Sequence, residues 1–117
     1  MLFTFHNDAP VTPIKPFGIF QIIWSAVNRI MYDPQQTTDE ILGEDERVSV
    51  YEALRAVTIN AAWQAREHEI KGSISEGKRA DLIILEKNPL KMEVKELRNN
   101  KVLHTFKDGR LVFSAEG

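Results

Sequence analysis

The chain has 117 residues, of which 43% are hydrophobic and 27% are charged, and its formal net charge is −2. This length suits one ordinary domain with its own core and is too short for a complete large enzyme. Lysine and arginine are spread without a dense block and cysteine is absent, which argues against nucleic-acid or membrane-surface partners and excludes disulfides, cysteine-ligated zinc and thiol catalysis. With no apolar run that could span a bilayer and no signal-peptide pattern, a cytoplasmic protein is the default expectation.

The first predicted element is a short strand at residues 1–5, where large apolar and small side chains alternate. A proline-spaced loop follows, and Pro16 leads into an amphipathic helix whose apolar positions recur at spacings of three and four. These positions are Phe20, Ile23, Trp24, Val27, Ile30 and Met31. Strand, loop and helix together predict one βα unit.

The middle of the chain predicts a polar loop and two short helices. Residues 33–47 are acidic and without periodicity, as expected of an exposed loop or flap. Ser49 and Glu52 have the spacing of a capping box, so a helix should follow to about Val57. Thr58 or Asn60 could cap a second helix over residues 59–66.

After Lys71 the pattern becomes that of strands and turns. Residues 72–74 and the aliphatic run 82–85 predict strands, and the run of four branched side chains suggests burial on both faces. Residues 72–78 match the start of a phosphate-binding P-loop, but Arg79 stands where serine or threonine should hold magnesium. A P-loop also opens a helix rather than a strand, so we interpret this segment as a turn.

The chain closes with a predicted β-hairpin. Asp108 and Gly109 tolerate the positive φ of a tight turn, and strand-like residues at 102–106 and 111–113 flank them.

Two ionisable residues follow the first strand directly. His6 and Asp8 are two apart, so both side chains could face one site if the strand continues. Imidazole and carboxylate suit a divalent metal or a base with its orienting partner, whereas loop capping by Asp8 beside an exposed His6 is the simpler alternative. His68 and His104 fit surface or packing positions better than a third ligand position.

The order of four segments resembles the carboxyl-terminal third of an amidohydrolase-superfamily enzyme, nearest the amidohydrolase 3 group. The segments are "HNDAPVTP", "VSVYEALRAVTINAAW", "KGSISEGKRADLIILEKNPL" and "VLHTFKDGRLVF", which together cover nearly the whole chain. The most specific pieces are "TINAA", with Thr58 and Asn60, and "GSISEGKRADLIIL", with Gly72, Gly77, Lys78, Ala80 and Asp81.

This resemblance implies an α+β chain in two parts. Residues 1–70 would be the last βα unit of a (β/α)₈ barrel with the helices after it, and residues 71–117 would belong to the β-rich small domain, a composite sandwich. Catalytic residues of such barrels lie at the carboxyl ends of strands. By resemblance, Asp8 would be the metal ligand and the acceptor of the water proton, and His6 would contact the substrate or support the metal ligands.

The family's early His-x-His pair, its bridging lysine or glutamate and its later histidines would belong to strands that precede residue 1. We therefore expect a fragment of a metal-dependent amidohydrolase that hydrolyses C–N bonds. A divalent metal, zinc being the expected ion, would serve the full-length enzyme, while this chain alone would be inactive and would hold no metal tightly. The alternative is a non-catalytic interaction or regulatory module that keeps the small-domain fold.

Two partners follow from that expectation. One is the missing barrel portion of the same enzyme. The other is a second copy of the chain, because a lone strand with Phe3 and Phe5, and the apolar stripe from Phe20 to Ile30, would lack the surfaces that normally cover them. The simplest assembly would be a two-fold dimer.

Overall fold

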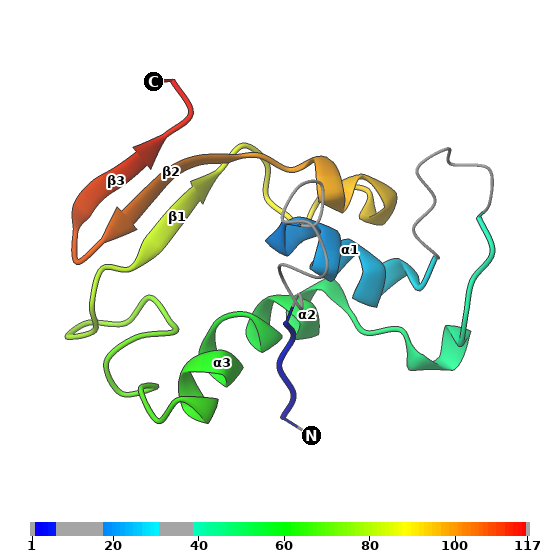
Figure 1. Ribbon diagram of the computed structural model, residues 1–117, viewed down its shortest axis with the longest axis horizontal. Coiled ribbons are helices and arrows are strands. Elements are labelled where there is room, and N and C mark those ends of the chain that lie inside the picture. The colour runs from blue at the N-terminus through cyan, green and yellow to red at the C-terminus, as the bar shows by residue number, and fades with distance from the viewer. Residues whose placement is uncertain (1, 7–17, 31–38, 117) are drawn as a thin grey trace.

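A computed structural model of the chain describes residues 2–6, 18–30 and 39–116. The elements in chain order are the helices α1 (Ile19–Asn28), η1 (Glu44–Glu46), α2 (Val50–Ala56) and α3 (Ile59–Gln64), the strand β1 (Leu82–Leu85), the short helix η2 (Val94–Asn99) and the strands β2 (Val102–Lys107) and β3 (Arg110–Ser114). The sheet lies at one end of the molecule and α1, η2 and α2 lie together away from it (Figure 1). Helices followed by an antiparallel sheet agree with the predicted α+β class.

Helix α1 forms the centre of the core, as its apolar periodicity predicts. The buried apolar cluster consists of Phe20, Ile23, Trp24, Val27, Ile30, Ala53 and Leu97. The helix begins after Gly18 and ends at Arg29, whose φ of 56° closes it in the left-handed region. Pro16 and Met31 lie outside the described residues.

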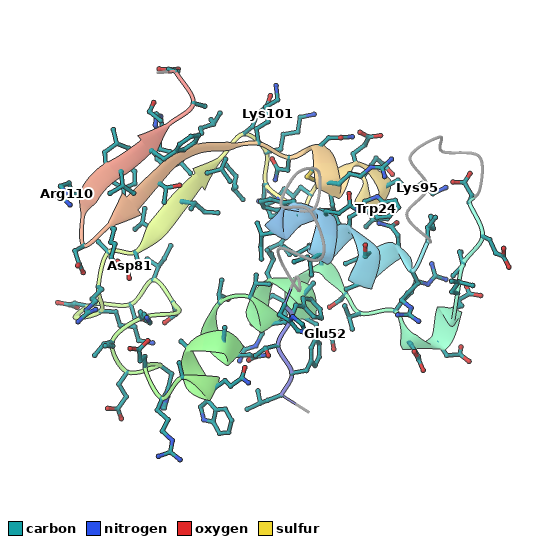
Figure 2. The ribbon with its side chains drawn as sticks, viewed as in Figure 1. Trp24, Glu52, Asp81, Lys95, Lys101 and Arg110 are labelled. Carbon is teal, nitrogen blue, oxygen red and sulfur yellow. The ribbon has the colours of Figure 1, made fainter. Side chains whose placement is uncertain are left out.

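Helix η2 covers the apolar side of α1. The indole nitrogen of Trp24 donates to the Lys95 carbonyl at 2.8 Å (Figure 2), and the amide of Asn28 donates to the Val94 carbonyl at 2.9 Å. The Arg98 guanidinium lies 4.5 Å from the centroid of the Trp24 ring, close enough for a cation–π contact. These contacts hold the polypeptide just before β2 against the first helix.

The expectation that the apolar stripe of α1 would be uncovered is wrong. Ile23 is 1% exposed and Val27 is 8% exposed, because η2 and α2 of the same chain pack on them. Within the described residues the stripe is therefore part of the core of its own chain.

The capping box before α2 is confirmed. The Glu52 amide donates to the Ser49 hydroxyl at 3.1 Å, and the Ser49 amide donates to the Glu52 carboxylate at 2.9 Å. The prediction of a side-chain cap on α3 is wrong, because Thr58 occupies the N-cap position while its hydroxyl donates back to the Leu54 carbonyl at 2.6 Å. The amide of Asn60 reaches Phe3 instead of capping the helix.

The three strands form an antiparallel sheet in the order β1-β2-β3. Thr105 in the central strand faces Ile83 on one side and Phe113 on the other. The predicted hairpin is confirmed, since Asp108 and Gly109 join β2 to β3 with φ values of 50° and 78°.

Two strand predictions need correction. Residues 72–74 form no strand, because Gly72 adopts a φ of 95° in the turn that follows α3. β1 exists as predicted, but Ile83 and Ile84 are 45% and 44% exposed, so the strand is not buried on both faces. The two side chains lie on opposite faces of the sheet. Leu85 and Val102, at the other end of the β1–β2 pair, are the sheet residues that pack against the helical core.

A third strand prediction, at residues 1–5, is wrong for the described residues 2–5, because they pair with no strand of the β1-β2-β3 sheet. The described part of residues 33–47 is an exposed loop as predicted, with the short helix η1 within it. The Phe3 and Phe5 rings nevertheless contact each other at 5.6 Å between centroids, as expected when alternate residues of an extended segment share a side. Phe5 packs against the core cluster. The segment is thus held to the helices although it has no sheet to join.

Candidate functional site

The candidate site begins at the amino-terminal segment, which α3 holds in place. The Asn60 side-chain amide donates to the Phe3 carbonyl at 3.1 Å. One turn later on the same helix, Gln64 accepts a hydrogen bond from the Thr4 hydroxyl at 2.8 Å. His6 follows directly and is exposed. Asp8, the predicted ligand and base, lies outside the described residues.

An open cleft of about 540 Å³ lies between this segment and α2. Its lining residues are Leu2, Phe3, Ser49, Tyr51, Glu52, Arg55 and Asn60. Arg55 lies 5.8 Å from the centroid of the Tyr51 ring. Figure 2 shows Glu52 on α2, below the core helices.

Glu52 is a capping residue rather than a proton acceptor for catalysis. The backbone amide and hydroxyl of Ser49 both donate to its carboxylate, and they hold the pKa of Glu52 below its ordinary value. A carboxylate with a lowered pKa is a weaker base at neutral pH. The cleft therefore offers binding surface but no base in the described residues.

The described residues do not fit a metal site. Across residues 2–6, 18–30 and 39–116, no three histidine, aspartate or glutamate side chains gather closely enough to hold an ion. His68 and His104 are half-buried, as expected of packing residues, and neither belongs to such a group. A catalytic zinc needs about three protein ligands, so His6 cannot provide a site without ligands from elsewhere.

The second sequence motif, at residues 72–81, is a structural joint between α3 and the sheet. A Cβ atom on Gly72 would lie 2.6 Å from the Ala62 Cβ and 3.2 Å from the Ile59 Cα, so only glycine permits this approach. The Lys78 ammonium donates to the Ser73 hydroxyl at 2.8 Å, and the Lys78 amide donates to the Ser75 carbonyl at 3.1 Å. The interpretation of residues 72–78 as a turn is confirmed.

Asp81 ends this motif at the turn of the hairpin. Its carboxylate accepts the Asp108 amide at 2.9 Å, and the Gly109 amide donates to the Ala80 carbonyl at 3.0 Å. The Asp108 amide keeps the pKa of Asp81 below its ordinary value, with nearby lysine and arginine charges adding to the effect. Figure 2 shows Asp81 beside the end of the hairpin where Arg110 begins β3. The aspartate therefore caps the hairpin turn.

The sequence model of the amidohydrolase family matches residues 1–113. The chain belongs to the amidohydrolase family. That membership confirms the resemblance drawn from the order of motifs, and it places segment 2–6 and the joint at 72–81 within one family pattern.

Two curated members of the amidohydrolase family illustrate the relation. The N-substituted formamide deformylase of Arthrobacter pascens is 36% identical over 105 residues, which are 90% of this chain and 18% of that protein. The imidazolonepropionase of Treponema denticola is 42% identical over 59 residues, which are 50% of this chain and 14% of that protein. The chain thus spans about a fifth or less of the relatives that it matches.

A solved amidohydrolase structure from Thermotoga maritima has a similar fold. It aligns with a TM-score of 0.67 at 22% identity, over 97% of this chain and 23% of that one. At that identity the likeness concerns the fold alone.

Among the described residues no helix has the length and apolarity needed to cross a bilayer.

Sequence reasoning missed the contacts that fix the amino-terminal segment. Asn60 looked like a helix cap because asparagine is common there, but its amide bonds a carbonyl 57 positions away. Its spacing from Gln64 was the available signal, because polar side chains four apart share one helix face.

Proposed function

We propose that this chain is the carboxyl-terminal portion of a metal-dependent amidohydrolase that hydrolyses non-peptide C–N bonds, either of linear amides or of cyclic amides. The metal would be a divalent ion, zinc being the expected one, with most of its ligands supplied outside this chain. The chain alone would be inactive, because a single carboxylate leaves most of the coordination of a metal to water.

The observation that carries the proposal is family membership over residues 1–113, together with the 36% identity to a formamide deformylase. Under the proposal, Asp8 accepts a proton from the attacking water and ligates the metal, and His6 contacts the substrate or supports the metal ligands. A base placed at the end of a barrel strand is the arrangement that such folds use.

The substrate class is proposed from the same relatives. An N-substituted formamide and the ring amide of an imidazolone both contain a C–N bond at a carbonyl carbon. N-substituted formamides are therefore the first substrates to assay, with cyclic amides second.

A non-catalytic module is the second candidate. The described residues bury their own core, since η2 and α2 cover α1, and Gly72, Lys78 and Asp81 of the 72–81 motif make structural contacts. Such a unit could persist as an interaction or regulatory module without chemistry.

The open reading frame around this segment separates the two candidates. An in-frame barrel with an upstream His-x-His pair, whose product contains zinc and hydrolyses N-substituted formamides or cyclic amides, supports the enzyme. A complete reading frame without that pair would contradict the enzyme proposal and favour the non-catalytic module. The 117-residue chain assayed alone is the negative control and should release no formate.

A further inference from the structure

Two polar side chains of α3 hold the segment that ends at His6. The Asn60 amide donates to the Phe3 carbonyl at 3.1 Å, and Gln64 accepts from the Thr4 hydroxyl at 2.8 Å. Residues four apart on a helix lie on the same face, so both groups act from one side of α3. Phe5, the next residue, packs against the core cluster.

Each of these contacts restrains a different part of the segment. Asn60 holds the main chain, Gln64 holds a side chain, and the core holds an aromatic ring. The three points are consecutive in sequence, at Phe3, Thr4 and Phe5, and directly precede His6. The main-chain contact matters most, because a carbonyl fixed by hydrogen bonding restricts the backbone on both sides of it.

The surroundings of Asn60 favour this residue type. Its side chain is 6% exposed, and a buried amide costs free energy unless it is hydrogen bonded. An aspartate in its place would have the same shape but no donor for the Phe3 carbonyl. An alanine would leave that carbonyl without its partner.

Helix α3 is itself fixed by the joint at residues 72–81. Gly72 lies against the first turn of α3, where an added Cβ would meet Ala62 at 2.6 Å and the Thr58 carbonyl at 3.3 Å. The two most specific motifs of the sequence are thus in contact. The joint at residues 72–81 places α3, and "TINAA" connects α3 to the amino-terminal segment through Asn60.

We propose that Asn60 is a positioning residue that fixes the backbone at Phe3 and thereby the position of His6. The inference rests on the proposed function, in which the segment ending at His6 contributes to the reacting site. Asn60 touches no reacting group, and it acts through the main chain of residues 3–6. "TINAA" is then a positioning motif rather than a helix cap.

NMR of the 117-residue chain tests this without any assay of activity. In the wild type, nuclear Overhauser contacts should connect the Asn60 side-chain amide protons to the α protons of Phe3 and Thr4. The backbone order parameter of residues 4–6 should be close to that of rigid structure, about 0.85. Missing contacts, or a wild-type order parameter below about 0.6, would overturn the inference.

The variants Asn60→Ala and Asn60→Asp then remove the donor. The order parameter at residues 4–6 should fall below about 0.6 and the His6 imidazole signals should shift, while β2 and β3 signals stay in place. Asn99→Ala is the matched control, because Asn99 is exposed and its side-chain amide donates to the Glu96 carboxylate, three residues earlier, at 2.8 Å. Unchanged His6 signals in both Asn60 variants would refute the positioning role.

The measurement on the wild type decides the question if the variants fail to fold. Failure of the proposed function gives a different result. An inactive full-length protein whose residues 4–6 are rigid would contradict the proposed function but not the positioning role of Asn60.

Discussion

Replacing Ile23 by alanine tests whether the apolar side of α1 is core. The side chain is 1% exposed and belongs to the cluster shared with α2 and η2. The change removes three buried carbon atoms, which costs about 2.4 kcal/mol at about 0.8 kcal/mol per methylene. The cavity left behind should bring the loss in free energy of unfolding to about 3 to 4 kcal/mol.

Urea unfolding followed by far-ultraviolet circular dichroism measures this loss. Ile19→Ala is the control on the same helix, because Ile19 is 43% exposed and its loss should cost less than about 1 kcal/mol. Should Ile23→Ala unfold the chain outright, Ile23→Val should still fold and cost about 0.5 to 1.5 kcal/mol. Equal costs at positions 19 and 23 would refute the assignment of this face to the core.

The concentration dependence of the same transition gives a second readout. If the α1 stripe were an interface between two copies, the unfolding midpoint would rise with protein concentration, because association stabilises the folded state by mass action. Burial by η2 within one chain predicts that Ile23→Ala lowers the midpoint by the same amount at every concentration.

Three further predictions concern the joint, the turn and the sheet. Gly72→Ala should destabilise the chain in thermal unfolding, since its added Cβ meets Ala62 at 2.6 Å. Gly18→Ala has open space around it and should cost less, because it changes only the N-cap residue of α1. Because the pKa of Asp81 is lowered by the hairpin-turn amide, its stabilisation exists above its unfolded pKa and disappears as the pH falls through the folded value. Asp81→Asn should therefore weaken the acid dependence of stability as the pH falls below the unfolded pKa of aspartate, measured by urea unfolding at each pH, and an unchanged profile would contradict the cause given. If the exposed sheet pairs between two copies, the double variant Ile84→Lys and Val112→Lys should self-associate less than the wild type in sedimentation equilibrium. A wild type that is already monomeric would contradict pairing through the sheet.

Local patterns in the sequence predicted local structure well. The capping box at Ser49, the apolar spacing of α1 and the Asp108 turn depend on residues within one or two turns of each other, so sequence alone specifies them. The structure confirms all three. Family membership likewise confirms the resemblance drawn from the order of motifs.

Predictions that depended on distant neighbours were less successful. The run at residues 82–85 looked like a strand buried on both faces, but burial depends on what packs over it, and Ile83 and Ile84 are half-exposed. The α1 stripe was expected to be uncovered because the barrel surface that it would pack against lies outside this chain. In the structure η2, some 70 positions away, covers it instead. The contact from Asn60 to Phe3 joins positions 57 apart, and it was missed.

The candidate site was predicted less completely than the fold. His6 lies at the end of a segment held by α3, a contact that the sequence did not indicate. Asp8 lies outside the described residues, and its role stays a prediction. In the described part of the chain no three histidine, aspartate or glutamate side chains lie close enough to hold a metal ion.

The most direct test of the central claim is the rate of amide hydrolysis by the full-length protein, encoded by the whole open reading frame, with the substitution Asp8→Asn. Asparagine keeps the size of the side chain but cannot take a proton, so kcat/KM on N-substituted formamides should fall by at least about a hundredfold. Asp45→Asn on the exposed helix η1 is the matched control and should leave the rate unchanged. Activity retained in Asp8→Asn, with the control equally active, would contradict the assignment of Asp8 as the base of an amidohydrolase.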